Sequence, residues 1–405
     1  MKHYRVGIIG FGAIGSVHAW AYAGLPFCYA PLPFSARVHA VATAHRDTAE
    51  AAAQICGAET AVTDYRQITE NPDIDIVHVC TPNVDHARQL FSALTHHKAV
   101  YSDKPLTATW SEALELAPLL ATHRNRVGMA FQLRFFPALM RARALMDDGR
   151  IGRVLSFRIV YLHAGSADPA VPAKWKLTHA AGGGVIADLA SHVLDLLASL
   201  GGEPVRISAE SSVAFPHRPA VDDPSRMVEI DAEDHVVALV HARFGNDPPA
   251  LGTIEATKIA TGTEDELRLE IHGTEGAIRF NSMEPHHLGF YRVDAPAAPL
   301  GGERGWTSID VGGRFPAPAA AFPGPKFVVG WPRMHLAAIA GFLFALHEGR
   351  MPVPGAVEAL YAQHLVDVLQ RSAAGSADVQ PWSRDLVTAL LEPPETRRNQ
   401  PRETP

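Results

Sequence analysis

Two hydrophobic patterns divide this chain into a first and a second part. In the first part, short apolar runs predict buried strands near residues 5–9, 37–42, 74–80, 98–102 and 126–130. Between them, apolar positions recur every three or four residues and predict helices near 13–23, 47–56, 84–96 and 109–121. Short strands that alternate with helices are typical of a doubly wound parallel sheet. We therefore assign residues 1–131 to an α/β domain of this kind.

The second part, residues 132–391, begins with a helix that ends near Asp147. From Arg153 onward, strand-like patterns predict strands near 153–162, 205–214, 235–244, 251–258, 266–272 and 276–281. Few helices separate them, so we expect one large, mostly antiparallel sheet. Helices near 334–348 and 356–372 complete this α+β domain. The Pro- and Arg-containing tail, 392–405, is predicted to be disordered.

Composition and charge narrow the classes of function. With 36 Lys and Arg against 43 Asp and Glu, the formal net charge is −7, which provides no general attraction for nucleic acid or for an anionic membrane. No apolar run approaches the roughly 20 residues that span a bilayer. Cys28, Cys56 and Cys80 are widely spaced and form no disulfide framework. We therefore expect a cytoplasmic protein that acts on a small molecule.

A glycine-rich turn follows the first predicted strand. It reads Gly10-Phe11-Gly12-Ala13-Ile14-Gly15 and lies directly between a strand and a helix. In such a motif the first glycine makes a tight turn, the second lets the backbone approach a pyrophosphate, and the third lets the helix pack on the strand. The motif in this context predicts a Rossmann domain that binds NAD or NADP.

The choice between NAD and NADP depends on the end of the second strand. An acid there usually binds the ribose hydroxyls of NAD, but Thr43-Ala44-His45-Arg46 contains none. Arg46 and His45 could bind the 2′-phosphate of NADP, or they could merely decorate a helix N-terminus. We slightly favour NADP, with Thr43, His45 and Arg46 as contacts, and leave both cofactors open. Just ahead of this strand, residues 26–35 are expected to form a Pro-containing loop.

Polar turns follow the next two long strands. Thr81-Pro82-Asn83, with His86 one turn later, follows the strand near 74–80, and Asp103-Lys104-Pro105 follows the strand near 98–102. Ligands of open α/β sheets bind beyond the carboxyl ends of the strands. We therefore expect these turns to meet the ribose and the nicotinamide.

Three consecutive glycines, Gly182-Gly183-Gly184, precede a stretch with helical apolar spacing. Asp188 and His192, four residues apart, would project from one face of that helix and touch. Backbone amides, an acid and an imidazole are then expected to converge, as in a site that handles a polar substrate and a proton. The two side chains could also be metal ligands with His163 or His179, but neither a His-Glu-x-x-His motif nor a cysteine set supports this. No metal is predicted.

In this order and spacing, the motifs resemble those of the glucose-fructose oxidoreductase and inositol dehydrogenase (Gfo/Idh/MocA) family over nearly the whole chain. They are the glycine turn at 10–15, Thr81-Pro82-Asn83-x-x-His86, Asp103-Lys104-Pro105, Arg134-x-x-Pro137, Trp175-Lys176 and Gly182-Gly183-Gly184-x-x-x-Asp188-x-x-x-His192. Members of that family join an N-terminal Rossmann domain to a C-terminal sheet domain, and most oxidise or reduce a hydroxyl or carbonyl of a sugar or cyclitol with NAD or NADP. The sheet domain often forms their oligomer interface, so the resemblance implies a homo-oligomer, a dimer or a tetramer.

The resemblance also implies roles for three side chains. Lys104 matches the family's catalytic lysine, with Asp103 in place of the glutamate of its Glu-Lys-Pro signature, and Asp188 and His192 match without departure. Neutral His192 is the best proton acceptor near neutral pH, and Asp188 would orient it or bind a neighbouring hydroxyl. Lys104 would stabilise charge on the reacting oxygen or carry the proton itself; these alternatives stay open.

Further contacts are predicted from their position along the chain. Gln132, Trp175 and Lys176, together with Asp103 and Lys104, are assigned to the cofactor, although the family often has Trp-Arg where Trp175-Lys176 stands. Polar and aromatic groups that suit a sugar are assigned to the substrate: Arg134, Tyr161, His163 and His179, with Asp188 and His192. We thus expect an NAD(P)-dependent dehydrogenase of a sugar, anhydrosugar, glycoside or cyclitol. The alternatives are a glycosidase or epimerase that uses tightly bound NAD transiently, and a non-enzymatic nucleotide sensor.

Overall fold

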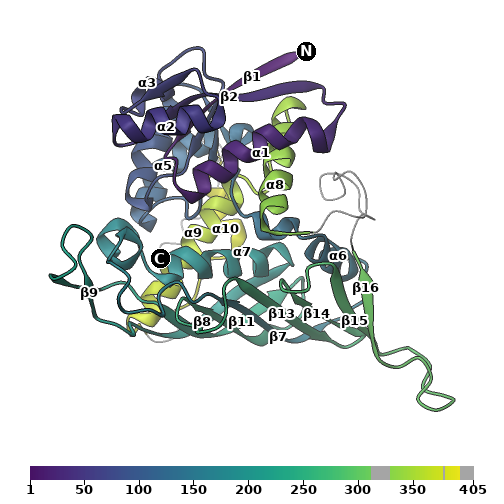
Figure 1. The fold of residues 1–405 in the computed structure, drawn as a ribbon. Coiled ribbons are helices and arrows are strands. Elements are labelled where there is room, and N and C mark those ends of the chain that lie inside the picture. Colours follow the sequence, from purple (N-terminus) through teal and green to yellow (C-terminus); the bar gives the residue numbers. More distant parts are fainter. Residues whose placement is uncertain (312–328, 377–378, 393–405) are drawn as a thin grey trace.

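Two large sheets organise the computed structural model, which describes residues 1–311, 329–376 and 379–392 (Figure 1). Parallel strands in the order β3-β2-β1-β4-β5-β6 form the first sheet. The second has the order β16-β15-β14-β13-β7-β12-β11-β8, in which only the pair β7 and β12 is parallel among the described strands. The predicted fold class is confirmed: an α/β Rossmann domain precedes an α+β domain with a large, mostly antiparallel sheet.

The first sheet consists of β1 (Lys2–Ile9), β2 (Phe34–Ala42), β3 (Thr60–Val62), β4 (Ile76–Val79), β5 (Ala99–Ser102) and β6 (Val127–Met129). Its helices are α1 (Ala13–Tyr29), α2 (Arg46–Cys56), α3 (Arg66–Thr69), α4 (His86–Thr95) and α5 (Trp110–Thr122), with short 3₁₀ turns η1 (Asn83–Asp85) and η2 (Arg124–Arg126). Every residue of β4 and β5 is buried, as expected for interior strands of a parallel sheet. The carboxyl ends of β1, β4 and β5 meet at one edge of the sheet.

Residues 26–35 differ from the predicted loop. α1 continues through Pro26 to Tyr29, and β2 already begins at Phe34. Tyr29 and Phe34 are buried, and both rings lie beside the ring of Phe344, at 6.2 and 5.3 Å. The loop prediction was wrong because this segment packs against a helix from the far end of the chain, which no local pattern reveals.

The second domain begins with η3 (Gln132–Phe135) and α6 (Pro137–Asp147) and continues into the large sheet. Its strands are β7 (Val154–Leu162), β8 (Gly202–Ser212), β11 (His235–Phe244), β12 (Ala250–Thr257), β13 (Glu266–Gly273), β14 (Gly276–Asn281), β15 (His287–Arg292) and β16 (Trp306–Asp310), with β9 (His217–Pro219) and β10 (Met227–Glu229) in a separate hairpin. Its helical segments are η4 (Trp175–Leu177), η5 (His179–Ala181), η6 (Ile186–Ala190), α7 (Ser191–Ser199), α8 (Trp331–His347), α9 (Ala356–Ala373) and α10 (Arg384–Ala389). The sequence did not predict β9, β10, β15, β16 or α10, which are all short. Residues 393–405, within the tail predicted to be disordered, lie outside the described part.

The helical stretch His179–Ser199 is apolar enough and long enough to cross a membrane, a feature that the sequence analysis did not predict. The mean hydropathy of an 18-residue window within this stretch is 1.3, and 83% of the window is buried inside the protein. Burial of this extent is typical of a core helix, and Figure 1 shows α7 between the first domain and the large sheet.

The C-terminal helices return to the first domain. α8 lies beside α1 in Figure 1, and Leu336 of α8 is in van der Waals reach of a Cβ built at Gly24 of α1. A Cβ at Gly128 in β6 would come within 2.5 Å of the Phe342 ring, so glycine is required there. The amide of Met129 donates a hydrogen bond to the carbonyl of Pro354, 3.1 Å away. The two ends of the chain therefore build one structure around the edge of the first sheet.

Candidate active site

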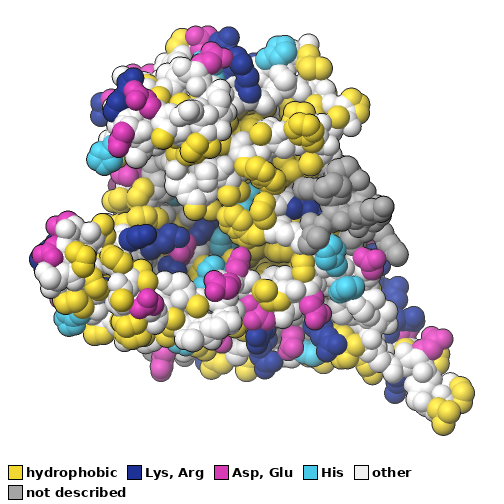
Figure 2. Space-filling view, in the orientation of Figure 1, with side chains coloured by type: hydrophobic (Ala, Val, Ile, Leu, Met, Phe, Trp, Pro, Cys, Tyr) yellow, Lys and Arg dark blue, Asp and Glu magenta, His cyan; other side chains and the backbone are white. Residues whose placement is uncertain are grey.

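A cleft of about 690 Å³ lies at the carboxyl edge of the first sheet. Figure 2 shows Lys and Arg side chains gathered between the upper and lower halves of the molecule. The predicted residues that line the cleft are Gly10, Phe11, Gly12, Ala13, Ile14, Thr43, Thr81, Pro82, Asn83, Asp103, Lys104, Trp175, Lys176 and Asp188. Lining residues that the sequence analysis did not predict include Thr48, Thr63, Tyr65, Asp85, Arg88 and Gln89. The structure thus brings residues from both domains to one cavity.

The glycine turn between β1 and α1 forms one end of this cleft. Gly10 has a φ of +86°, and a Cβ there would lie 2.5 Å from the carbonyl oxygen of Cys80. A Cβ at Gly15 would lie 2.1 Å from the carbonyl oxygen of Gly10, so this residue serves the packing of helix on strand and not the lining of the cleft. A Cβ at Gly12 would meet no described atom within 4 Å. Gly12 lines the cleft, so the space beside it is open to a ligand.

The turns after β4 and β5 are fixed to each other and to the second domain. His86 is buried, with its ring nitrogens 2.9 Å from the carbonyl oxygen of Pro105 and 3.0 Å from that of Thr81. It therefore holds the two turns together behind the cleft. The Asn83 amide donates to the carbonyl oxygen of Gly182, 2.7 Å away, and connects the first domain to the triple-glycine turn.

Asp188 lies at the centre of three ammonium groups. Lys104, just after β5, places its Nζ 2.7 Å from Oδ1 and 2.6 Å from the backbone oxygen of Asp188. Lys176 reaches Oδ2 at 3.0 Å, and Lys258 reaches the same oxygen at 2.8 Å. The side chains of Lys104 and Lys258 are only 11% and 9% exposed, whereas that of Lys176 is half-exposed. One carboxylate thus organises three cations from three separate segments.

The charges around Asp188 fix its protonation state. Burial alone would raise its pKa, but Lys104, Lys258 and Lys176 hold the pKa well below its usual value. Burial would lower the pKa of Lys176, yet the Asp188 carboxylate raises it. For Lys258, burial outweighs the attraction of Asp188 and lowers the pKa. Asp188 is therefore a permanent anion near neutral pH and not a proton acceptor.

His192 lies on α7, behind the cleft lining. Its side chain is buried, and its ring packs edge-on against those of Phe131 and Tyr161, each 6.0 Å away. Burial, followed by the positive charge of Lys104, holds the pKa of His192 well below its usual value, so the imidazole is neutral. No hydrogen bond joins it to Asp188 in the described structure, and its Nδ1 has no partner there. Asp188 lies in the π-helical turn η6, and its carboxylate is bound by lysines instead.

The triple-glycine turn serves a different purpose from the one predicted. The amides of Gly184 and Ile186 are bound by the carbonyl oxygen of Lys176 and the carboxylate of Glu233, both at 2.9 Å. A Cβ at Gly184, whose φ is +104°, would come within 2.4 Å of Glu233. The glycines therefore let the chain pass close to Glu233. The amides of this turn are bonded within the protein and do not converge on a substrate.

Several predicted contacts lie outside the cleft lining. Arg134 of η3 forms a bidentate salt bridge with Asp195 of α7, in which Nε lies 2.6 Å from Oδ2. His163 pairs with Asp265 at 3.0 Å, and His179 with Glu233 at 3.3 Å. The remaining predicted residues outside the lining are Gly15, His45, Arg46, His86, Gln132, Tyr161 and His192. The guanidinium group of Arg134 is thus occupied by Asp195, which follows His192 by three residues on α7.

The adenosine end of the cleft contains hydroxyls and no carboxylate at the end of β2. The hydroxyls of Thr43 and Thr48 are 2.6 Å apart, and both donate to the backbone oxygen of His45. Arg46 is exposed at the start of α2, with its Nε 2.6 Å from Glu50. Arg46 does not line the cleft.

Sequence reasoning missed Lys258 and Glu233. Lys258 directly follows β12, whose parallel neighbour β7 is in the middle of the large sheet. Glu233 lies in the segment before β11. Both are polar residues next to buried strands, which is the available signal, but a mostly antiparallel sheet gives no rule for which strand ends meet.

Comparison with known proteins identifies the same two parts. A family model described as "Oxidoreductase family, NAD-binding Rossmann fold" matches residues 4–131, and a "GFO/IDH/MocA C-terminal domain" model matches residues 139–279. The levoglucosan dehydrogenase of Pseudarthrobacter phenanthrenivorans is 32% identical, over 92% of this chain and 97% of that protein. The inositol 2-dehydrogenase of Rhizobium meliloti is 27% identical, over 91% of this chain and 97% of its own length.

Solved structures are similar over the same extent. A levoglucosan dehydrogenase in complex with NADH and L-sorbose matches with a TM-score of 0.88 at 32% identity, covering 94% of this chain and 100% of the other. Its complex with NADH and levoglucosan matches with a TM-score of 0.86 and the same coverage. The likeness therefore extends through both domains.

Proposed function

This chain belongs to the Gfo/Idh/MocA family of NAD-binding oxidoreductases, and we propose that it transfers hydride between a sugar-like or cyclitol hydroxyl and a nicotinamide cofactor. One observation supports this most directly. The Lys104 ammonium group and the ionised Asp188 meet at the wall of the dinucleotide cleft, with neutral His192 behind them. Oxidation of an alcohol needs a cation beside the developing alkoxide and a proton acceptor, and these groups provide both.

The cleft fits a dinucleotide. Gly12 leaves space that no described atom of the protein fills, and the N-terminus of α1 faces it through Ala13 and Ile14. A helix N-terminus of this kind favours a pyrophosphate. NAD or NADP, when bound, would supply the hydride acceptor for alcohol oxidation, and the hydride donor for the reverse reaction. Gly10 to Ile14 would hold its phosphates, and Trp175 and Lys176 its nicotinamide half.

We assign distinct roles to the three site residues. Lys104 holds the reacting oxygen and stabilises its negative charge. Asp188 stays ionised, fixes Lys104 through its carboxylate and backbone oxygens, and accepts hydrogen bonds from substrate hydroxyls. His192 accepts the hydroxyl proton, since it is neutral and is not held by another acid. The substrate class of sugars, anhydrosugars, glycosides and cyclitols is supported by the levoglucosan and inositol dehydrogenases among the relatives.

The proposal is tested with purified protein and a panel of anhydrosugars, pyranoses and inositols, each with NAD⁺ and with NADP⁺. Formation of reduced nicotinamide, followed by its absorbance, is the expected result for at least one substrate. An enzyme that uses the cofactor transiently would instead convert substrate with no net reduced cofactor. A nucleotide sensor would bind the cofactor and convert nothing. Either outcome would overturn the proposal.

We propose that the site accepts NAD and NADP, with NADP use dependent on Arg46. The end of β2 has no acid to select NAD, and Arg46 can exchange Glu50 for a 2′-phosphate. Arg46→Ala is expected to lower kcat/KM for NADP⁺ about tenfold, the value of one charged hydrogen bond, and to leave NAD⁺ unaffected. Steady-state kinetics with both cofactors measure this. Arg37→Ala, which removes the exposed pair with Glu59, is the control. Equal losses with both cofactors would refute the role of Arg46.

We further propose that Lys258 positions the Asp188 carboxylate. Lys258→Met leaves one oxygen of Asp188 with only the half-exposed Lys176, so the carboxylate can turn away from Lys104. A misplacement of about 1 Å can cost ~10²-fold in rate, and we expect a loss of about that size in kcat. The dissociation constant of the reduced cofactor, measured by fluorescence, should stay unchanged.

Lys174→Met is the matched control for Lys258→Met. Lys174 is exposed and only two residues from Lys176, so its loss should leave kcat unaltered. Lys258→Arg should restore part of the rate, because it keeps a cation near Asp188. Wild-type kcat in Lys258→Met, with the protein folded, would contradict a positioning role.

The open face of the large sheet supports a homo-oligomer. Leu155, Val237, Leu239 and Leu251 lie on neighbouring strands β7, β11 and β12, and each is between 41% and 52% exposed. They alternate with buried residues that face the helices. An exposed apolar patch of this kind marks an interaction surface, and we propose that a second copy of the chain covers it.

A further inference from the structure

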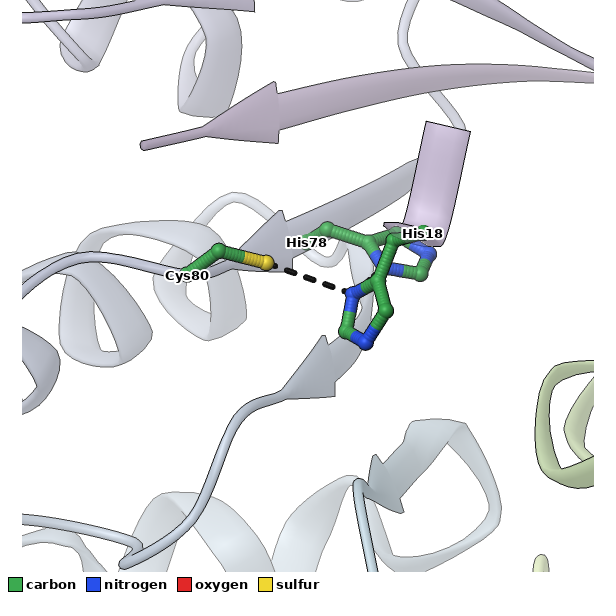
Figure 3. Close-up of side chains that lie close together, drawn as sticks. All are labelled: His18, His78 and Cys80. Atoms are coloured by element: carbon green, nitrogen blue, oxygen red, sulfur yellow. Dashed lines mark hydrogen bonds between the residues drawn. The ribbon is translucent and has the colours of Figure 1, made fainter. Parts of the chain in front are cut away.

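A cluster of nitrogen and sulfur ligands lies outside the groups used above. His18 of α1, His78 of β4 and Cys80 just beyond β4 lie close together, and each offers one ligand atom within 4.8 Å of the other two (Figure 3). Nδ1 of His18 is 3.0 Å from Nδ1 of His78 and 3.3 Å from Sγ of Cys80. The two histidines are fully buried, and Cys80 also lines the cleft. His78 and Cys80 are two residues apart, so they project on the same side of the chain.

Hydrogen bonds alone do not satisfy these groups. Both contacts end on the single ring nitrogen Nδ1 of His18, which in a neutral imidazole has either one proton or one lone pair to offer. One of its two neighbours, His78 or Cys80, therefore lacks a well-formed hydrogen bond to this nitrogen. Nε2 of His18 is buried with no partner in the described part of the chain, and the same is true of both ring nitrogens of His335, whose ring lies 5.6 Å from that of His18. Unpartnered buried polar atoms are costly in a folded protein.

We propose that His18, His78 and Cys80 bind a zinc ion. Two imidazoles and a thiolate are a ligand set that suits Zn²⁺. Zinc–nitrogen bonds of about 2.0 Å and a zinc–sulfur bond of about 2.3 Å place tetrahedral ligand atoms about 3.3 to 3.6 Å apart. The two separations from Nδ1 of His18 need to widen by only a few tenths of an ångström to match, and the ligand atoms of His78 and Cys80 lie within 4.8 Å of each other. On binding, Cys80 loses its proton to solvent.

The surroundings of the cluster fit a metal site. Nε2 of His78 lies 2.8 Å from the hydroxyl oxygen of Tyr22, and it would donate a hydrogen bond to that oxygen once Nδ1 binds zinc. Partners of this kind orient metal-bound histidines. Cys80 gives the ion a route from the cleft, and water or His335 completes the coordination. The ion would tie α1 to β4, the two elements whose ends form the glycine turn and the Thr81 turn.

Cobalt is the probe that tests this site, because Co²⁺ bound to a thiolate absorbs in the near ultraviolet. Full-length protein, purified with a non-coordinating reductant, is titrated with Co²⁺ and then with Zn²⁺. We expect one cobalt per chain, a thiolate charge-transfer band, and displacement of the cobalt by zinc. Zinc should also raise the melting temperature of this protein.

Variants locate the ion. Cys80→Ala should remove the charge-transfer band and weaken cobalt binding at least tenfold, whereas Cys28→Ala and Cys56→Ala, which remove the other free thiols, should change neither. His78→Phe should weaken binding while any residual complex keeps the band. Wild-type protein that binds no cobalt, or a band that survives in Cys80→Ala, would overturn the proposal. Since the readout is spectroscopic, it is independent of the proposed dehydrogenase activity.

Discussion

Lys104→Met is expected to reduce kcat for alcohol oxidation by about 10²–10³-fold, as the loss of one preorganised donor at a developing oxyanion does. Methionine keeps the length and the apolar stem of lysine, but it removes the ammonium group that donates to the backbone oxygen and to Oδ1 of Asp188, at 2.6 and 2.7 Å. The interaction is lost mainly in the transition state, so KM should change little. Steady-state kinetics on the best substrate measure the two constants separately.

Two further measurements make the Lys104 prediction specific. Binding of reduced cofactor, followed by fluorescence, should remain, because the glycine turn and the Thr81 turn are intact. Lys104→Arg should recover part of the rate if the residue acts as a fixed cation, and none if it must give up a proton. A kcat within a few-fold of wild type in Lys104→Met would remove the lysine from the proposed mechanism.

His192→Asn is expected to lower kcat by about 10²–10⁴-fold, the usual contribution of a positioned general base. Asparagine keeps a polar group in the pocket formed by Phe131 and Tyr161 but takes up no proton. A base must be neutral to act, and activity falls as the pH drops through its pKa. Because burial and Lys104 hold the pKa of His192 well below 6.5, the acid limb of kcat/KM in the wild type should lie well below pH 6.5. A pH–rate profile of both proteins checks this.

The matched control for His192 is His163→Asn. His163 is paired with Asp265 outside the cleft lining, so its replacement should leave kcat within a few-fold of the wild-type value. An acid limb near the ordinary histidine pKa, or one that persists unchanged in His192→Asn, would show that another group takes the proton.

The sequence predicted the architecture well where local patterns decide it. Strand–helix alternation gave the parallel sheet, and Gly10, Thr81 and Lys104 were placed correctly at its carboxyl edge because parallel strands all end on one side. The family resemblance implied that Asp188 belongs to the same site, and Asp188 lines this cleft. The cytoplasmic location and the disordered tail stay predictions.

Partners that depend on tertiary packing could not be predicted. Lys258 reaches Asp188 from a different strand end, and nothing near either residue encodes that meeting. Arg134 was expected to bind the substrate, yet its guanidinium group binds Asp195 of α7, a partner 61 residues later in the chain. The amides at 183–186 looked free in the sequence, but Glu233 and nearby carbonyls bind them.

The return of α8 to the first domain has a consequence for synthesis of the protein. Chains leave the ribosome from the N-terminus, and domains commonly fold in that order. In this chain, Leu336 covers Gly24 and Phe342 covers Gly128. Both covering residues are synthesised more than 200 residues after the first sheet is complete. Until they emerge, part of the dinucleotide domain has apolar surface exposed to solvent. The nascent first domain must therefore wait, incompletely packed, for nearly the whole chain, which is where we expect it to depend most on chaperones.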